Sequence, residues 1–138
     1  MIVFIYENIT SEEAKAKSID FYEKVTKTSL GKLSKTEKGK PVLDYGFISV
    51  SHTKNIVCVA ISEKEIGIDI ESKTREIKLP NMTIKRWTEV EAYAKWKGCG
   101  IEKDKIYLDI PKLWLHEIIA LKDYYISVYS EDGEIFVK

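Results

Sequence analysis

The chain has 138 residues, of which 44% are apolar and 11% aromatic, so it is long enough to bury a core, and a single compact domain over residues 1–138 is expected. Its 22 basic and 22 acidic residues cancel, which argues against nucleic acid and anionic membrane surfaces as partners. Any anion-binding site must therefore be local.

The first residues, Met1 to Ile5, lack the basic start, apolar stretch and cleavage site of a secretory signal, so a cytoplasmic protein is expected. The longest apolar run, Ile56 to Ile61, is too short to span a membrane. Cys58 lies in that run and Cys99 lies between two glycines, positions that favour two free thiols over a disulfide or a zinc site.

The first half of the chain is predicted to hold a strand, a helix and an exposed turn. β-branched and aromatic residues predict a strand over Ile2 to Tyr6. A helix is predicted to begin at Thr10 or Ser11 and to end near Gly31. The lysine-rich stretch Leu33 to Pro41 contains Gly-Lys-Pro and is expected to be an exposed turn. The apolar stripe of the helix is predicted to contain Ala14, Ile19, Phe21, Tyr22 and Val25.

Three strands are predicted in the middle of the chain. Phe47 to Val50 and Asn55 to Ile61 are joined by a turn short enough to pair them antiparallel. In Ile66 to Glu71 apolar and other residues alternate strictly, so Gly67, Asp69 and Glu71 share one face of a strand and the isoleucines share the other. Two carboxylates are thereby placed side by side, next to a glycine.

A second helix is predicted over Thr83 to Lys97, with Thr83 as a cap and with Gly98 and Gly100 as a stop. On this helix Trp87, Glu91 and Lys95 are spaced by four residues and lie along one face. Further strands are predicted over residues 106–108, 113–118, 124–129 and 135–137. Each half of the chain then has one helix and a few strands.

Asp69 and Glu71 on a strand face, with Glu91 available from a helix, form the oxygen-rich set that Mg²⁺ prefers when it also binds phosphates. The alternative is that the two strand carboxylates line a solvated edge. His52 either donates to a phosphate oxygen or caps a turn, and Lys40 either binds an anion or is a solvated charge.

The order of these sequence elements along the chain is similar to that in a known protein family. Gly-Lys-Pro, Phe-Ile-Ser-Val-Ser-His-Thr, a buried strand, Gly-Ile-Asp-Ile-Glu, and Trp-Thr-x-x-Glu-Ala-x-x-Lys followed by Gly-x-Gly cover residues 38–101. Together they resemble the phosphopantetheinyl transferase superfamily. They are similar to the two-lobed type that serves peptide and polyketide synthetases, rather than to the trimeric holo-acyl-carrier-protein synthase, in which the Ser-His element comes last.

The resemblance implies a pseudo-symmetric α/β (α+β) fold with two lobes, about residues 1–63 and 64–138, each a small antiparallel sheet with a helix. Coenzyme A would bind in the cleft between the lobes. The implied activity is Mg²⁺-dependent transfer of phosphopantetheine from coenzyme A to a serine of an acyl or peptidyl carrier protein, by a monomer.

The resemblance also implies roles for single residues. Asp69, Glu71 and Glu91 would bind Mg²⁺, and Glu91 would help to deprotonate the carrier serine. Lys95 would contact the phosphate under attack, with His52 as a further cation. The nucleotide end of coenzyme A would be held by Lys40, Ser51, His52 and Lys17, the last in place of an arginine or, alternatively, only a solvated lysine.

The sequence departs from the family in two places. Val90 stands where the family usually has lysine, so one charge near the phosphates is missing. The segment from Ser72 to Arg86, which in the family helps to contact the carrier, is short here. Two alternatives to an active transferase follow: a relative that binds coenzyme A or a carrier without transfer, and a non-enzymatic interaction module.

Overall fold

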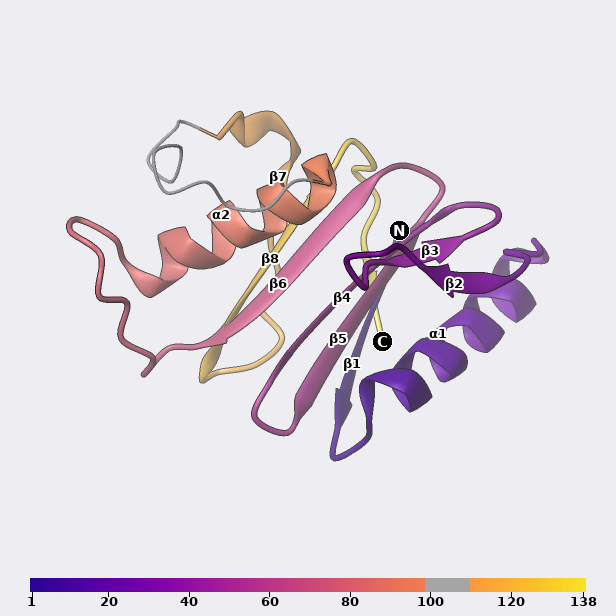
Figure 1. The fold of residues 1–138 in the computed structure, drawn as a ribbon, viewed down its shortest axis with the longest axis horizontal. Coiled ribbons are helices and arrows are strands. Elements are labelled where there is room, and N and C mark those ends of the chain that lie inside the picture. Colours follow the sequence, from indigo (N-terminus) through magenta and orange to yellow (C-terminus); the bar gives the residue numbers. More distant parts are fainter. Residues whose placement is uncertain (99–109) are drawn as a thin grey trace.

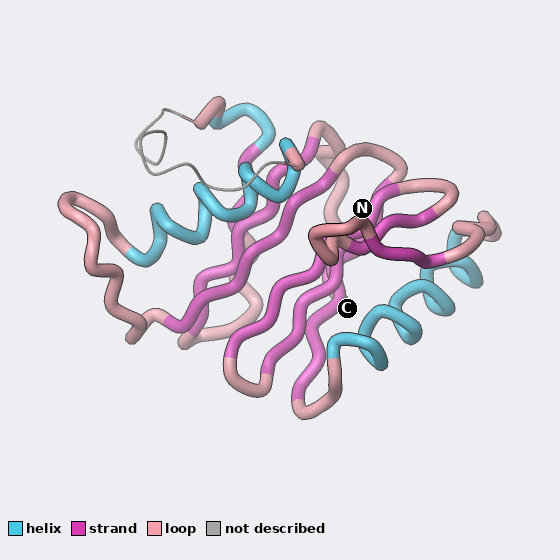
Figure 2. The backbone as a smooth tube through the Cα atoms, viewed as in Figure 1, coloured by secondary structure: helices cyan, strands magenta, loops and turns pink. Residues whose placement is uncertain are grey.

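The computed structural model describes residues 1–98 and 110–138, and over these the protein has a mixed α+β fold (Figure 1). The layers run helix, sheet, sheet, helix, with the helices on the two outer sides (Figure 2). The helices are α1 (Ser11–Thr26) and α2 (Ile84–Lys97), with a short 3-10 helix over Lys112–Trp114. The predicted strand over residues 106–108 and Cys99 lie outside the described residues.

The first sheet has the strand order β4-β5-β1-β9. Its strands are β1 (Ile2–Glu7), β4 (Phe47–Thr53), β5 (Ile56–Ser62) and β9 (Phe136–Val137). The predicted antiparallel pairing of β4 with β5 is confirmed, with Val50 opposite Val59. The last strand returns from the far end of the chain to pair with β1 in parallel, so the first sheet is not purely antiparallel.

The second sheet has the order β6-β8-β7 and is antiparallel. Its strands are β6 (Ile66–Ser72), β7 (Leu115–Glu117) and β8 (Tyr124–Ser130). The predicted alternation in β6 is confirmed, because Ile66, Ile68 and Ile70 all lie in the core between the two sheets. All seven residues of β6 are buried, since helix α2 covers the face opposite the isoleucines.

Three apolar clusters fill the spaces between the layers. One lies between the sheets and contains Val3, Cys58 and Val128, another lies between the first sheet and α1, and the third lies between the second sheet and α2. Burial in the first of these raises the pKa of the Cys58 thiol to about 12, so this cysteine is an inert core residue.

Both helices begin as predicted, at threonine caps. Thr10 Oγ1 accepts from the Glu13 amide and Thr83 Oγ1 accepts from the Arg86 amide, each at 3.1 Å. Gly98 ends α2 as predicted, with a φ of 76°. The first helix is shorter than predicted, because Lys27 takes the left-handed conformation and stops it before Gly31.

Two further predictions in the first half are wrong. Val25 does not belong to the buried stripe of α1, since it is 57% exposed. The stretch Leu33 to Pro41 is not only a turn, because β2 (Leu33–Lys35) pairs antiparallel with β3 (Pro41–Leu43) in a separate hairpin. Gly39 and Lys40 lie at the exposed end of that hairpin, between its two strands.

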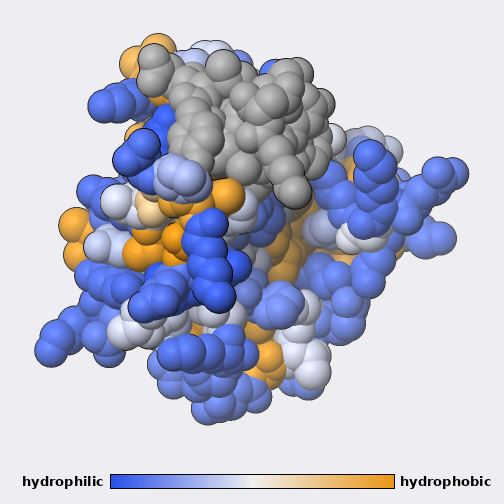
Figure 3. Space-filling model, turned by 60° about the vertical axis from the view of Figure 1, so that its left-hand side comes forward, coloured by the Kyte–Doolittle hydropathy of each residue, from blue (hydrophilic) through white to orange (hydrophobic). Residues whose placement is uncertain are grey.

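Hydrophilic side chains dominate the face shown in Figure 3, with apolar ones in smaller patches between them. Among residues 1–98 and 110–138, no helix combines the length and the apolar character needed to cross a membrane.

Candidate functional site

A cleft of about 720 Å³ lies between the β2–β3 hairpin, strand β4 and the carboxyl end of α2. Its volume falls in the range of sites that bind small molecules and cofactors. One wall is the hairpin end, Thr36 to Pro41, and the floor includes Ser49 and Val50 of β4. The opposite wall includes Lys95 and Gly98.

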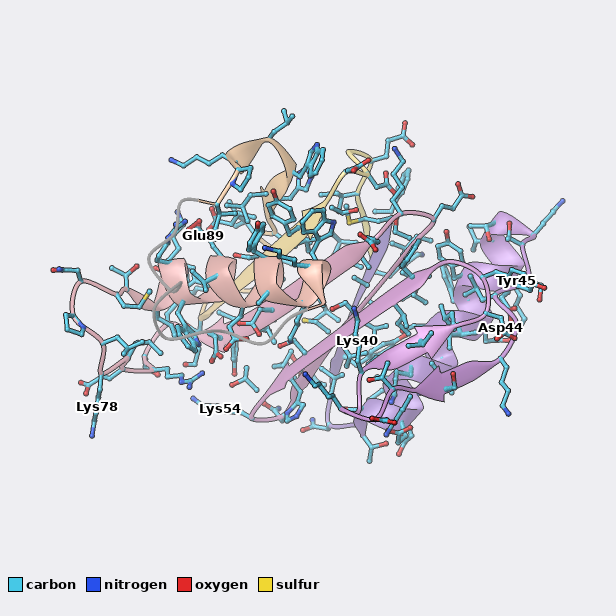
Figure 4. All side chains as sticks on the ribbon, turned by 45° about the horizontal axis from the view of Figure 1, so that its top comes forward. Lys40, Asp44, Tyr45, Lys54, Lys78 and Glu89 are labelled. Atoms are coloured by element: carbon cyan, nitrogen blue, oxygen red, sulfur yellow. The ribbon has the colours of Figure 1, made fainter. Side chains whose placement is uncertain are left out.

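Lys40 reaches across the cleft from the hairpin to the end of α2 (Figure 4). Its ammonium group donates to the Lys95 carbonyl oxygen at 3.4 Å, one of the last carbonyls of the helix. A cation is favoured there by the negative end of the helix dipole. Lys40 and Lys95 thus both line this one cleft, in a protein whose net charge is zero.

Asp69 is 5% exposed and contacts Lys95, one of the residues that line the cleft. Its Oδ1 atom accepts from the Ser51 hydroxyl at 2.9 Å and from Lys95 Nζ at 3.4 Å. Its Oδ2 atom is buried and has no hydrogen-bond partner among the described residues. A buried carboxylate oxygen without a partner is costly, which makes this atom a candidate contact for a bound ion.

Burial raises the pKa of Asp69 from its ordinary 3.8 to about 7. The Lys95 ammonium opposes the rise, and the nearby charges of Glu91 and Glu71 add to it. Burial likewise raises the pKa of Glu91. The three predicted acidic residues therefore lie near enough to affect one another, and the alternative that Asp69 and Glu71 line a solvated edge is wrong, because both are buried.

Glu71 is not free to act as a ligand in this conformation. Arg75, from the loop after β6, forms an ion pair with its Oε1 atom. Among the described residues, no three His, Cys, Asp or Glu side chains are arranged to hold a metal ion. The donor types of the three predicted residues suit Mg²⁺ and Asp69 Oδ2 is unpartnered, but in this conformation the three carboxylates are not gathered around one position.

Gly67 determines how closely α2 approaches this strand. A Cβ atom at position 67 would lie 2.0 Å from the Ala92 carbonyl oxygen and 2.4 Å from the Trp96 amide nitrogen. Only glycine allows the helix backbone to rest directly on β6. This contact places Glu91 and Lys95, on the same helix, over the acidic residues of the strand.

The remaining predicted residues differ in whether they contact the acidic residues of the site. The Ser51 hydroxyl is used within the protein, because it donates to Asp69 and accepts from the Ile70 amide at 3.2 Å. His52 is exposed at the end of β4. Lys17 is exposed on α1, where it lines a different hollow of about 410 Å³ together with Phe21 and Lys138.

No protein-family model matches the sequence, and no curated protein matches it.

Three residues of the site were not identified from the sequence in their observed roles: Ser49, Gly67 and Arg75. The signal for Ser49 was its spacing of two from Ser51, which predicts that both point from the same face of β4. The glycine was visible beside the two carboxylates, but its contact with a helix was not. For Arg75 no pattern was available, since its partner depends on the path of a loop.

Proposed function

We propose that the protein is a phosphopantetheinyl transferase, which moves phosphopantetheine from coenzyme A to a serine of an acyl or peptidyl carrier protein. The observation that carries the proposal is the cleft lined by Lys40 and Lys95, together with the buried Asp69, which accepts from Lys95 and whose Oδ2 atom has no partner among the described residues. Such a site offers the Lys40 ammonium group and the nearby positive charge of Lys95 to phosphate oxygens, and a carboxylate for a divalent ion.

The two sheets, each with one helix, support a two-lobed fold of the kind that the resemblance implies, with the cleft at the boundary between the lobes. Lys40 is suited to the nucleotide end of coenzyme A, since it lines the cleft and carries a charge. Lys17 lies away from this cleft, which favours the alternative that it is a solvated lysine. Ser51 acts by orienting Asp69 rather than by contact with the nucleotide.

In the proposed reaction the serine oxygen bonds to the phosphorus of the pantetheine-linked phosphate, and the bond from that phosphorus to 3′,5′-ADP breaks. The nucleotide leaves with the electron pair, and the serine proton passes to a base. Glu91 is the candidate base, because burial raises its pKa and so makes it a better proton acceptor. Mg²⁺ held by Asp69, Glu71 and Glu91 would offset the charge of the diphosphate.

The test is a mass assay. Apo acyl and peptidyl carrier proteins are incubated with coenzyme A, Mg²⁺ and the protein, and their intact masses are measured. The expected result is a mass increase equal to one phosphopantetheine, which Asp69→Ala abolishes while the fold persists by circular dichroism. If coenzyme A raises the melting temperature but no carrier gains mass, the protein is a binding relative without transfer. If coenzyme A has no effect at all, the proposal fails.

A further inference from the structure

Strands β4 and β6 lie side by side but belong to different sheets, each at the edge of its own. The Ile68 amide donates to Ser49 Oγ at 3.1 Å, and the Ile70 amide donates to Ser51 Oγ at 3.2 Å. Side-chain hydroxyls thus take the place of backbone carbonyls as acceptors. We call these two strand edges and their two serine bonds the seam.

Lys95 lies across the seam. Its ammonium group donates to the Val50 carbonyl of β4 at 3.1 Å, to the Ile68 carbonyl of β6 at 3.0 Å and to Asp69 Oδ1 at 3.4 Å. A lysine ammonium has three N–H donors, so these contacts use all of them. Although 32% of the side chain is exposed, no donor is left over for a ligand in this conformation.

We propose that Lys95 is a clamp that holds the two sheets together across the seam and thereby fixes the floor of the cleft. Hydrogen bonds from a cation are stronger than neutral ones, and this cation bonds to one carbonyl from each strand edge. Without it, both carbonyls and the Asp69 carboxylate would lose a donor, and the bonds left across the seam among the described residues would be those of Ser49 and Ser51, including the bond from Ser51 to Asp69.

The clamp affects the cleft because Lys95 and its partner Val50 are both part of the cleft lining. Lys95, Ser49 and Val50 all line it, and the opposite wall touches the clamp residue through the bond from Lys40 to the Lys95 carbonyl. Separation of β4 from β6 would widen the floor and shift Asp69, whose Oδ1 atom is held by Ser51 and Lys95 together. Lys95 is thus a positioning residue, whatever ligand the cleft takes.

The test is amide hydrogen exchange, measured by NMR on the full chain without coenzyme A or metal. Lys95→Met keeps a side chain of similar length and removes the donors. We expect the Ile68 and Ile70 amides, which donate across the seam, to exchange about tenfold faster or more, with little change at Ile126 inside the second sheet. Lys97→Met, at an exposed position in the same helical turn, is the matched control and leaves all of these rates unchanged.

Two further variants complete the test. Lys95→Arg keeps a cation with several donors and is expected to restore part of the protection at Ile68 and Ile70. Should Lys95→Met not fold, Lys95→Gln, which keeps one donor group, takes its place in the same comparison. Unchanged exchange at Ile68 and Ile70 in the folded variant would overturn the clamp, and so would a failure of arginine to restore any protection.

The outcome is independent of the proposed transferase activity, because no ligand enters the exchange experiment. A second arm uses coenzyme A as the probe. Lys40→Met is expected to weaken its binding without altering exchange at Ile68 and Ile70, whereas Lys95→Met alters both. If coenzyme A does not bind the wild type, the proposed function fails while the clamp stands or falls on the exchange rates.

Discussion

The backbone of Ala92 in α2 rests directly on Gly67 in β6, with no room for a side chain between them. This one contact sets the distance between the helix that carries Glu91 and Lys95 and the strand that carries Asp69 and Glu71. The site is therefore built on a helix–strand contact that a single methyl group would prevent.

Gly67→Ala is expected to lower the free energy of unfolding by about 2 to 4 kcal/mol, because a Cβ atom 2.0 Å from the Ala92 oxygen forces the helix away from the strand. Urea denaturation measures the change. Gly133→Ala is the control, since a Cβ atom there meets nothing within 4 Å and is expected to change stability by less than about 0.5 kcal/mol. Equal stability of the two variants would contradict the packing argument.

The sequence alone predicts the local parts of this site well. Alternation in β6 predicts which residues face the core, and the caps of α2 predict where the helix begins and ends, because both depend on neighbours along the chain. Alternation also places Asp69 and Glu71 on one strand face, whereas the position of Glu91 beside them could be predicted only through the family resemblance.

Contacts between distant elements could not be predicted. The periodicity of α1 places Lys17 on a helix, but not on which side of the molecule that helix lies, and the structure puts it by a separate hollow. The serine bonds to β6 require two sheet edges to meet, which no local pattern encodes. The ion pair of Arg75 with Glu71 is another case, since it depends on how the chain leaves β6.

The raised pKa of Asp69 makes stability depend on pH. Between its ordinary 3.8 and about 7 the folded protein binds more protons than the unfolded chain, so stability falls as the pH rises through this window. Relative to Asp69→Asn, the wild type is expected to lose on the order of 2 to 4 kcal/mol between pH 4 and pH 8. The measurement is urea denaturation with a chelator present at each pH. Parallel pH profiles of the two proteins would show that Asp69 does not carry the shift.

If Glu71 binds a divalent ion as proposed, its ion pair with Arg75 would compete with the metal. Arg75→Gln is expected to tighten Mn²⁺ binding by about threefold to tenfold, because it frees the Glu71 carboxylate and removes a nearby positive charge. Electron paramagnetic resonance of free Mn²⁺ measures the affinity without coenzyme A. Lys73→Gln removes the same charge from the same loop, where Lys73 contacts the Tyr125 ring instead. If both variants change the affinity equally, the effect is general electrostatics and not release of Glu71.

Val90, which stands where the resembling family usually has lysine, is 7% exposed and packs in one cluster with Ala92 and Tyr129. Val90→Lys is therefore expected to lower the free energy of unfolding by about 1 to 3 kcal/mol, since it buries a charge, and not to supply a cation to the cleft. Val90→Met has a side chain of similar length without the charge and separates the cost of size from the cost of charge. A lysine variant as stable as the methionine variant, with tighter coenzyme A binding, would mean instead that position 90 can turn its side chain toward the phosphates.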